Sequence, residues 1–211
     1  MKINENKIFV FGDSYTKGHG CLENEEFYNK YKRDENDKIW CNIISENLMM
    51  ELINFGVGLY SNDKIIDSVI EKYNLIKKND IVLIQKTFSH RIDIPNINND
   101  KLITIAPGMI DYYADYSKND IEKLNYILFL SDSELYKKRQ DLRFEFLVNI
   151  LIDKGVNCIL WNIMNYLNLE RIIECSNGEI VDHHWSFNGH REMANNILNL
   201  IKNNTLYEVD M

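Results

Sequence analysis

The residues best suited to chemistry lie near the two ends of the chain. Ser14 follows an apolar run, residues 7–11, through the dipeptide Gly12-Asp13, and this is the pattern of a buried strand that ends in a tight turn. In an open parallel sheet, ligands bind beyond the carboxyl ends of the strands, so a hydroxyl at this point can reach an acyl group. Ser14 is therefore a candidate nucleophile, although Asp and Ser are also ordinary turn and N-cap residues.

A serine hydroxyl needs a base, and a short segment near the C-terminus supplies the residue types for one. The run Asp182-His183-His184-Trp185 offers a carboxylate and imidazoles just before the expected start of a helix. An imidazole can accept the serine proton, and a carboxylate can hold that imidazole in the required tautomer. The two ends of the chain together indicate acyl chemistry.

Three blocks, taken in order, resemble the SGNH (GDSL) hydrolases. They are Gly12-Asp13-Ser14, Asn54-Phe55-Gly56-Val57-Gly58, and Asp182-x-His184-Trp185 followed by Gly189-His190. Each block alone is weak, but their order and approximate spacing match along almost the whole chain. The resemblance implies a flavodoxin-like three-layer fold and a Ser-His-Asp triad that hydrolyses esters. Because polysaccharide-modifying relatives carry an Asp-x-His-Trp block, it implies His184 as the base and Asp182 as its partner.

The resemblance also implies the position of the oxyanion hole. Glycines placed directly after a strand let the backbone turn tightly and expose its N–H groups. The family's donor glycine aligns here with Leu59, and Gly58 precedes it. We expect backbone donors at Ser14 and Leu59. A leucine at this place narrows the conformations that the loop can adopt.

The third block departs further from the family pattern, which usually reads Gly-x-Asn-Asp. This chain has Lys86-Thr87-Phe88-Ser89-His90-Arg91, so Ser89 stands at the asparagine position and is the expected substitute donor. Losing one oxyanion donor can cost roughly 3 kcal/mol of transition-state stabilisation. The guanidinium of Arg91 suits a carboxylate or another anionic substituent of the substrate, and a surface ion pair is its alternative role. The predicted substrate-binding residues are Asp13, Thr87, Arg91 and Trp185.

The elements that must position these residues alternate between strand and helix, which is typical of a parallel α/β sheet. Strands are expected over residues 7–12, 51–55, 80–85 and 156–161, with 179–181 as a fifth strand or an extended segment. Helices are expected over 37–50, 61–78 and 187–202, and two more over 119–153 with a break near 131–133. The predicted fold is a three-layer α/β/α sandwich, with a flavodoxin-like parallel sheet of about five strands. We expect one domain, 1–211, with a substrate-side insertion at about 89–120.

Composition limits the partners. A formal net charge of -8 and a pI near 5.2 argue against nucleic acid and anionic membranes as partners. The N-terminus has no long apolar signal core and no apolar run approaches spanning length, so we expect a cytoplasmic protein. The cysteines have no CxxC spacing and are interpreted as reduced thiols: Cys21, Cys41, Cys158 and Cys175. The expected partner is a small-molecule or carbohydrate ester, with no cofactor and no metal, and the oligomeric state stays open.

The predicted reaction is removal of a small acyl group, such as acetyl, from a carbohydrate or another small ester. Other readings stay open. The altered third block fits a catalytically weak or inactive module that binds a glycan or a protein, and an acyltransferase would use the same residues. Ser14-x-x-Lys17 matches penicillin-binding enzymes, but the Ser-Asp-Asn element of those enzymes is absent. A metal-dependent hydrolase could use Asp13, Asp182, His183, His184 and His190, without a spaced ligand motif to support it; a structural role for His190 is favoured.

Overall fold

A parallel sheet of four strands forms the centre of the computed structural model, which describes residues 5–18, 38–95, 102–106, 133–169, 171–173 and 180–203. The strands are β1 (Lys7–Phe11), β2 (Glu51–Asn54), β3 (Ile81–Lys86) and β6 (Asn157–Asn162), in the order β2-β1-β3-β6. The chain runs outward from β1 to β2 and then returns to β3 on the other side. This reversal creates a switch point between β1 and β3, the place where doubly wound proteins bind ligands.

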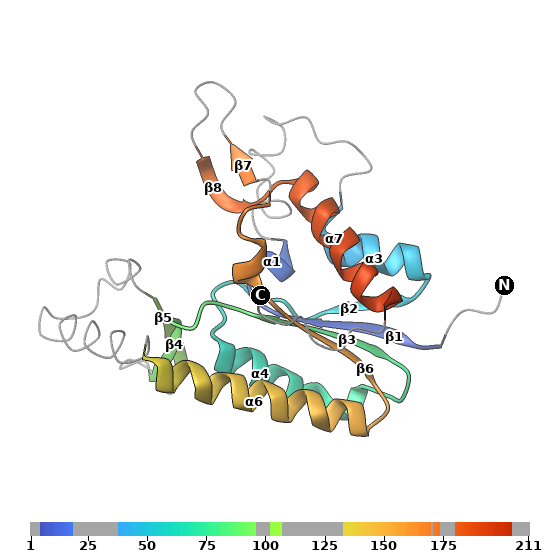
Figure 1. The fold of residues 1–211 in the computed structure, drawn as a ribbon, viewed down its shortest axis with the longest axis horizontal. Helices are drawn as coiled ribbons and strands as arrows, with labels where there is room; N and C mark the ends of the chain where they lie inside the picture. The colour runs from blue at the N-terminus through green and yellow to red at the C-terminus, as the bar shows by residue number, and fades with distance from the viewer. Residues whose placement is uncertain are drawn as a thin grey trace, which may run out of the picture.

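Helices cover both faces of this sheet (Figure 1). Helices α4 (Asn62–Lys72) and α6 (Glu134–Asp153) pack on one face, and α3 (Trp40–Leu48) and α7 (Phe187–Lys202) pack on the other. The side chains of a strand alternate between faces. In β1, Ile8 and Val10 join the cluster under α3 and α7, whereas Phe9 and Phe11 join the cluster under α4 and α6. The apolar run before Ser14 is therefore buried on both sides, as a strand in the middle of such a sheet requires.

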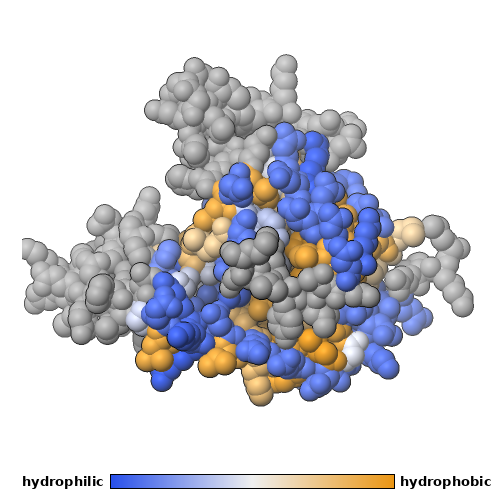
Figure 2. Space-filling view, in the orientation of Figure 1, coloured by the Kyte–Doolittle hydropathy of each residue, from blue (hydrophilic) through white to orange (hydrophobic). Residues whose placement is uncertain are grey.

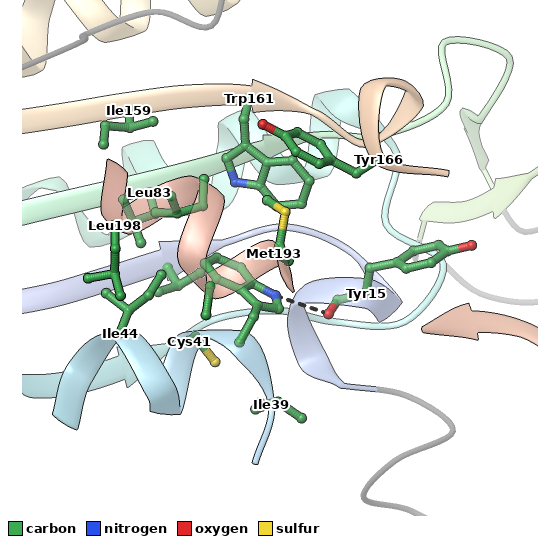
Figure 3. Close-up of a cluster of buried hydrophobic side chains, with 14 of the residues drawn as sticks. Tyr15, Ile39, Cys41, Ile44, Leu83, Ile159, Trp161, Tyr166, Met193 and Leu198 are labelled. Atoms are coloured by element: carbon green, nitrogen blue, oxygen red, sulfur yellow. Dashed lines mark hydrogen bonds between the residues drawn. The ribbon is translucent and has the colours of Figure 1, made fainter. Parts of the chain in front are cut away.

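The α3/α7 side of the core holds the helix that starts at Ser14. This short helix, α1 (Ser14–Lys17), presents the main-chain oxygen of Tyr15 to the indole N–H of Trp40, at 3.3 Å (Figure 3). Trp40 meets Trp161 of β6 edge to face, with ring centroids 5.6 Å apart. The first turn beyond β1 is thus fixed to a rigid aromatic core.

The predicted α/β class is confirmed, with two differences in detail. The segment expected as a fifth strand lies in β8 (Ile180–Trp185), which pairs antiparallel with β7 (Arg171–Ile173) outside the central sheet. The helix expected over 61–78 ends earlier, with a 3₁₀ turn, η1 (Tyr73–Leu75), after α4. A second 3₁₀ turn, η3 (Ile163–Tyr166), follows β6. The last helix has the predicted bounds.

The region expected as an insertion begins with a separate hairpin. Strands β4 (Ile92–Pro95) and β5 (Leu102–Ile105) pair antiparallel and lie outside the central sheet. Residues 96–101 and 107–120 of this segment, and the first of the two helices expected over 119–153, lie outside the described residues. A single domain with a substrate-side insertion stays a prediction.

The outer face of α6 mixes polar and apolar residues. Leu135, Leu142 and Phe146 are each about two-thirds exposed, and Figure 2 shows apolar patches between hydrophilic ones along the lower edge of the view, where α6 runs. Among the described helices, none is long and apolar enough to cross a membrane.

Candidate active site

Ser14 stands at the carboxyl end of β1 because the chain turns sharply through Gly12 and Asp13. A Cβ atom on Gly12 would overlap the Thr16 hydroxyl and the Gln85 side chain, so only glycine allows this close approach. Asp13 is the N-cap of α1, and its Oδ1 accepts the N–H of Tyr15 at 3.0 Å. Ser14 is the first residue of the helix and is nearly buried.

The structure brings the predicted nucleophile and the predicted base together. Nε2 of His184 lies 2.8 Å from Oγ of Ser14, a hydrogen bond across 170 positions of sequence. The ring of Tyr15 packs on the imidazole, with centroids 4.8 Å apart, and on Trp185, at 5.0 Å. The imidazole is thus supported from the side by the residue next to the serine.

Asp182 lies two residues before His184 in β8, where its backbone pairs with Ile172. The side chains of Asp182 and His183 lie outside what the structure describes. The carboxylate member of the triad, and the expectation that His183 points elsewhere, therefore stay predictions.

The second sequence block packs directly on α1. Nδ2 of Asn54 donates to the main-chain oxygen of Thr16 at 2.9 Å, and Oδ1 of Asn54 accepts the N–H of Gly56 at 2.8 Å. A Cβ atom on Gly56 would overlap Thr16 and the backbone of Lys17. The loop after β2 is thereby held against the turn that carries Ser14.

Leu59 has a left-handed backbone, with φ at 64°. It occupies the third position of a turn that the N–H of Tyr60 closes on the oxygen of Val57, at 3.3 Å, a position where glycine is usual. A left-handed conformation costs a residue with a Cβ roughly 1–2 kcal/mol. The glycine that the family resemblance implies would avoid this cost. A Cβ atom added at Gly58 would meet open space, so packing does not require that glycine.

Two backbone donors have the property that an oxyanion hole needs. Within the described part of the chain, the N–H groups of Ser14 and Leu59 donate to no protein acceptor. Both belong to segments that the contacts above hold close to each other. Their joint action on one oxygen atom stays a prediction.

Asp13 is fully buried, and its carboxylate is saturated with donors. Oδ1 accepts from Nε2 of Gln85 at 2.6 Å, and Oδ2 accepts from the Thr87 hydroxyl at 2.6 Å and from Nη1 of Arg91 at 2.7 Å. A buried carboxylate is stable only when it is paired and hydrogen-bonded in this way. Asp13 therefore supports the serine turn from the interior, instead of forming a substrate-binding surface. Thr87 bonds to Asp13 and also lines a cavity, so its role in substrate binding stays a prediction.

Arg91 is also an interior residue, with 10% of its side chain exposed. Its Nη1 lies 3.0 Å from the Thr87 hydroxyl and 3.3 Å from the main-chain oxygen of Tyr60. One guanidinium nitrogen therefore connects the Asp13-Ser14 turn with the turn that contains Leu59. Neither expected role of Arg91, an anion-binding residue or a surface ion pair, describes these contacts.

Trp185 was expected to bind substrate, and its side chain instead lies in the core. It is fully buried, its Nε1 donates to the oxygen of Tyr166 at 3.1 Å, and it stacks on Trp161 with centroids 6.2 Å apart. His190 is buried beside it, and burial lowers the pKa of His190 to about 3, so this imidazole is neutral at pH 7. Its Nδ1 accepts the N–H of Trp40 at 3.5 Å, in agreement with a structural role.

Ser89, the expected third oxyanion donor, lines a cavity of about 380 Å³ beyond the ends of β3 and β6. Ser14 is not among the residues that line this cavity, and no hydrogen bond joins the two serines. The role of Ser89 in an oxyanion hole stays a prediction without a contact to support it.

Two residues that support the site, Gln85 and Asn62, were not predicted from the sequence. Gln85 bonds to Asp13 and also to the Thr16 hydroxyl. Asn62 holds the third block, because its Oδ1 accepts the main-chain N–H of Thr87 at 2.8 Å. Gln85 had a signal, since it is the polar residue at the end of an otherwise apolar buried strand. Asn62 had none, because it looked like an ordinary helix start. Among the described side chains, no group of three or more His, Cys, Asp and Glu residues could hold a metal ion.

These features define a class: a doubly wound α/β protein with a hydrogen-bonded serine-histidine pair at the carboxyl edge of its sheet. No protein-family model and no curated protein sequence matches the chain. It is similar to the solved structure of a G-D-S-L family protein from Desulfitobacterium hafniense, at 10% identity, with 93% of this chain and 99% of the other covered and a TM-score of 0.37. A member of the lipolytic protein G-D-S-L family from Veillonella parvula is similar at 14% identity, with 95% and 75% covered and a TM-score of 0.32. These values are too low to assign the chain to that family.

Proposed function

We propose that this protein is a serine ester hydrolase that removes a small acyl group, acetyl in the first instance, from a carbohydrate or another small ester. The observation that carries the proposal is the 2.8 Å contact between Oγ of Ser14 and Nε2 of His184. A base within hydrogen-bond reach of a hydroxyl at the ligand-binding edge of the sheet is the arrangement that nucleophilic acyl chemistry requires.

The proposed reaction proceeds in two halves. As Oγ of Ser14 attacks the ester carbonyl, its proton passes to Nε2 of His184, and the carbonyl oxygen becomes an oxyanion. The C–O bond to the alcohol then breaks, and the departing oxygen takes the proton from His184. In the second half, water gives a proton to His184 and attacks the acyl-serine. The bond between the acyl carbon and Oγ then breaks, His184 returns the proton to Oγ of Ser14, and the carboxylic acid leaves.

Three supporting roles complete the proposal. The N–H groups of Ser14 and Leu59 stabilise the oxyanion, because both are donors without a protein acceptor in the described part of the chain. Asp182 orients the imidazole, since residues two apart in a strand share a face. The Asp13 network holds the serine turn in one geometry before substrate arrives, which lowers the reorganisation needed during the reaction.

The test compares the purified protein with its Ser14→Ala variant in hydrolysis of p-nitrophenyl acetate and in labelling by a fluorophosphonate probe. We expect both activities in the wild type and neither in Ser14→Ala. Ser68→Ala, on helix α4, is the matched control because it removes a hydroxyl away from the site and should keep both. A folded wild type that shows neither hydrolysis nor labelling would contradict the proposal and favour a binding module.

A further inference from the structure

The cavity of about 380 Å³ that Ser89 lines lies close to the proposed nucleophile without including it. It opens beyond β3 and β6 and is bounded by the first half of α6. Its wall includes Thr87, whose hydroxyl bonds to Asp13 beside Ser14. Strand β3, which leads to Thr87, is the neighbour of β1, which leads to Ser14. The hydrogen bond from the Thr87 hydroxyl to Asp13 thus joins the cavity wall to the turn that carries the proposed nucleophile.

One buried donor in this wall has no hydrogen bond. Gln140 of α6 is 3% exposed, and its Oε1 accepts from Nδ2 of Asn62 at 3.0 Å, but its Nε2 has no partner. Burial raises the pKa of the neighbouring Tyr136 phenol, and an interaction with the Gln140 side chain opposes that rise. A buried donor left without an acceptor carries a cost in free energy, because it has lost its hydrogen bond to water. An oxygen atom of a ligand in the cavity would remove this cost.

The charge of the cavity wall differs in sign from that of the whole chain. The charged residues of the wall are Lys86, Lys137 and Asp141, so with His90 neutral the wall has a net charge of +1. The whole chain has a formal net charge of -8. Nζ of Lys86 lies 2.5 Å from Oδ1 of Asp141. Lys137 lies 3.9 Å from the exposed carboxylate of Glu134, and such an exposed pair contributes little. The wall also contains the polar side chains of Ser89 and Asn162.

We propose that this cavity is a subsite for a carboxylate-bearing, hydroxylated part of the ester. Lys137 and Lys86 face the carboxylate, and Nε2 of Gln140 donates to an oxygen atom of the same group. The anion recognition expected of Arg91 thereby falls to the lysines, because Arg91 is bonded to Asp13. This inference rests on the proposed function for its substrate, and the binding that it predicts can be measured without turnover.

The experiment titrates the isotopically labelled Ser14→Ala protein with methyl glucuronide and with methyl glucoside, and follows amide chemical shifts. The two probes share a ring and differ in the carboxylate. We expect the glucuronide to bind more tightly, to shift resonances of residues around the cavity, and to lose its advantage as salt screens the lysines. In Ser14→Ala/Lys137→Gln we expect the glucuronide to bind about fivefold more weakly, with the glucoside unchanged.

Lys138→Gln in the same background is the matched control, since Lys138 is the neighbouring residue on α6, is exposed, and does not line the cavity. Equal affinities for the two glycosides, no binding of either, or equal losses in the Lys137 and Lys138 variants would overturn the proposal. Because Ser14→Ala is used throughout, glucuronide binding by a protein that proves inactive as an esterase would overturn the proposed function and keep the subsite as a binding site.

Discussion

At Arg91, one guanidinium nitrogen bonds to Asp13 and to the oxygen of Tyr60, and so links the segments of both proposed oxyanion donors. Arg91→Lys keeps a positive charge beside Asp13 but cannot reproduce the fixed geometry of the guanidinium. We expect kcat for p-nitrophenyl acetate to fall about tenfold, less than the loss from deleting an oxyanion donor outright. The measurement is kcat and KM together with urea unfolding.

Arg143→Lys is the control for Arg91→Lys, because Arg143 pairs with Asp63 between α6 and α4 and is half exposed. We expect its kcat to match that of the wild type. A folded Arg91→Lys protein with unchanged kcat would show that the bridge does not position the site.

Leu59 offers a test of strain at the same loop. Leu59→Gly removes the cost of a left-handed backbone but adds freedom to the unfolded chain, so we expect a net gain of about 0.5–1 kcal/mol in unfolding free energy. Met49→Gly, at the end of α3, is the control, since Met49 is also left-handed, with φ at 52°. Both variants should be stabilised in urea unfolding, and a Leu59→Gly protein less stable than the wild type would contradict the assignment of strain.

At the scale of elements, local patterns predicted strand β1, which leads to Ser14, and helix α7, which follows His184, because period and capping signals lie within each segment. They did not predict the short helix α1 that holds Ser14 or the strand β8 that holds His184. The partners of Asp13 could not be predicted in the same way. They lie 72 to 78 positions away, on β3 and the loop after it, and no local pattern reports a contact across that separation. The segment 179–181 was ambiguous for a related reason, since a short apolar run does not reveal which strand it pairs with.

Burial within elements also predicts thiol reactivity. Cys41 lies in α3 and Cys158 in β6, and desolvation raises the pKa of each thiol to about 12. Because the thiolate is the reactive form, we expect iodoacetamide at pH 8 to leave both unmodified in the native protein and to label both in urea. Peptide mass spectrometry reads each cysteine separately. Rapid native labelling of either would contradict the packing of its element.

At the scale of the whole molecule, His190 couples folding to pH. Burial, with a smaller contribution from the charge of His184, lowers the pKa of His190 from 6.5 to about 3 in the folded protein. Between these values the unfolded chain binds a proton that the folded protein does not. The unfolding free energy therefore keeps its full value above pH 6.5 and falls by about 1.4 kcal/mol per pH unit below it.

Urea unfolding of the wild type and of His190→Gln at pH 7 and pH 5 tests this coupling. The wild type should lose about 2 kcal/mol more than the variant over this interval, because only the wild type gains the extra proton on unfolding. The comparison cancels the contributions of the carboxylates, which both proteins share. Equal losses in the two proteins would contradict this coupling, because they would mean that His190 is protonated inside the fold, beside Trp40 and Trp185.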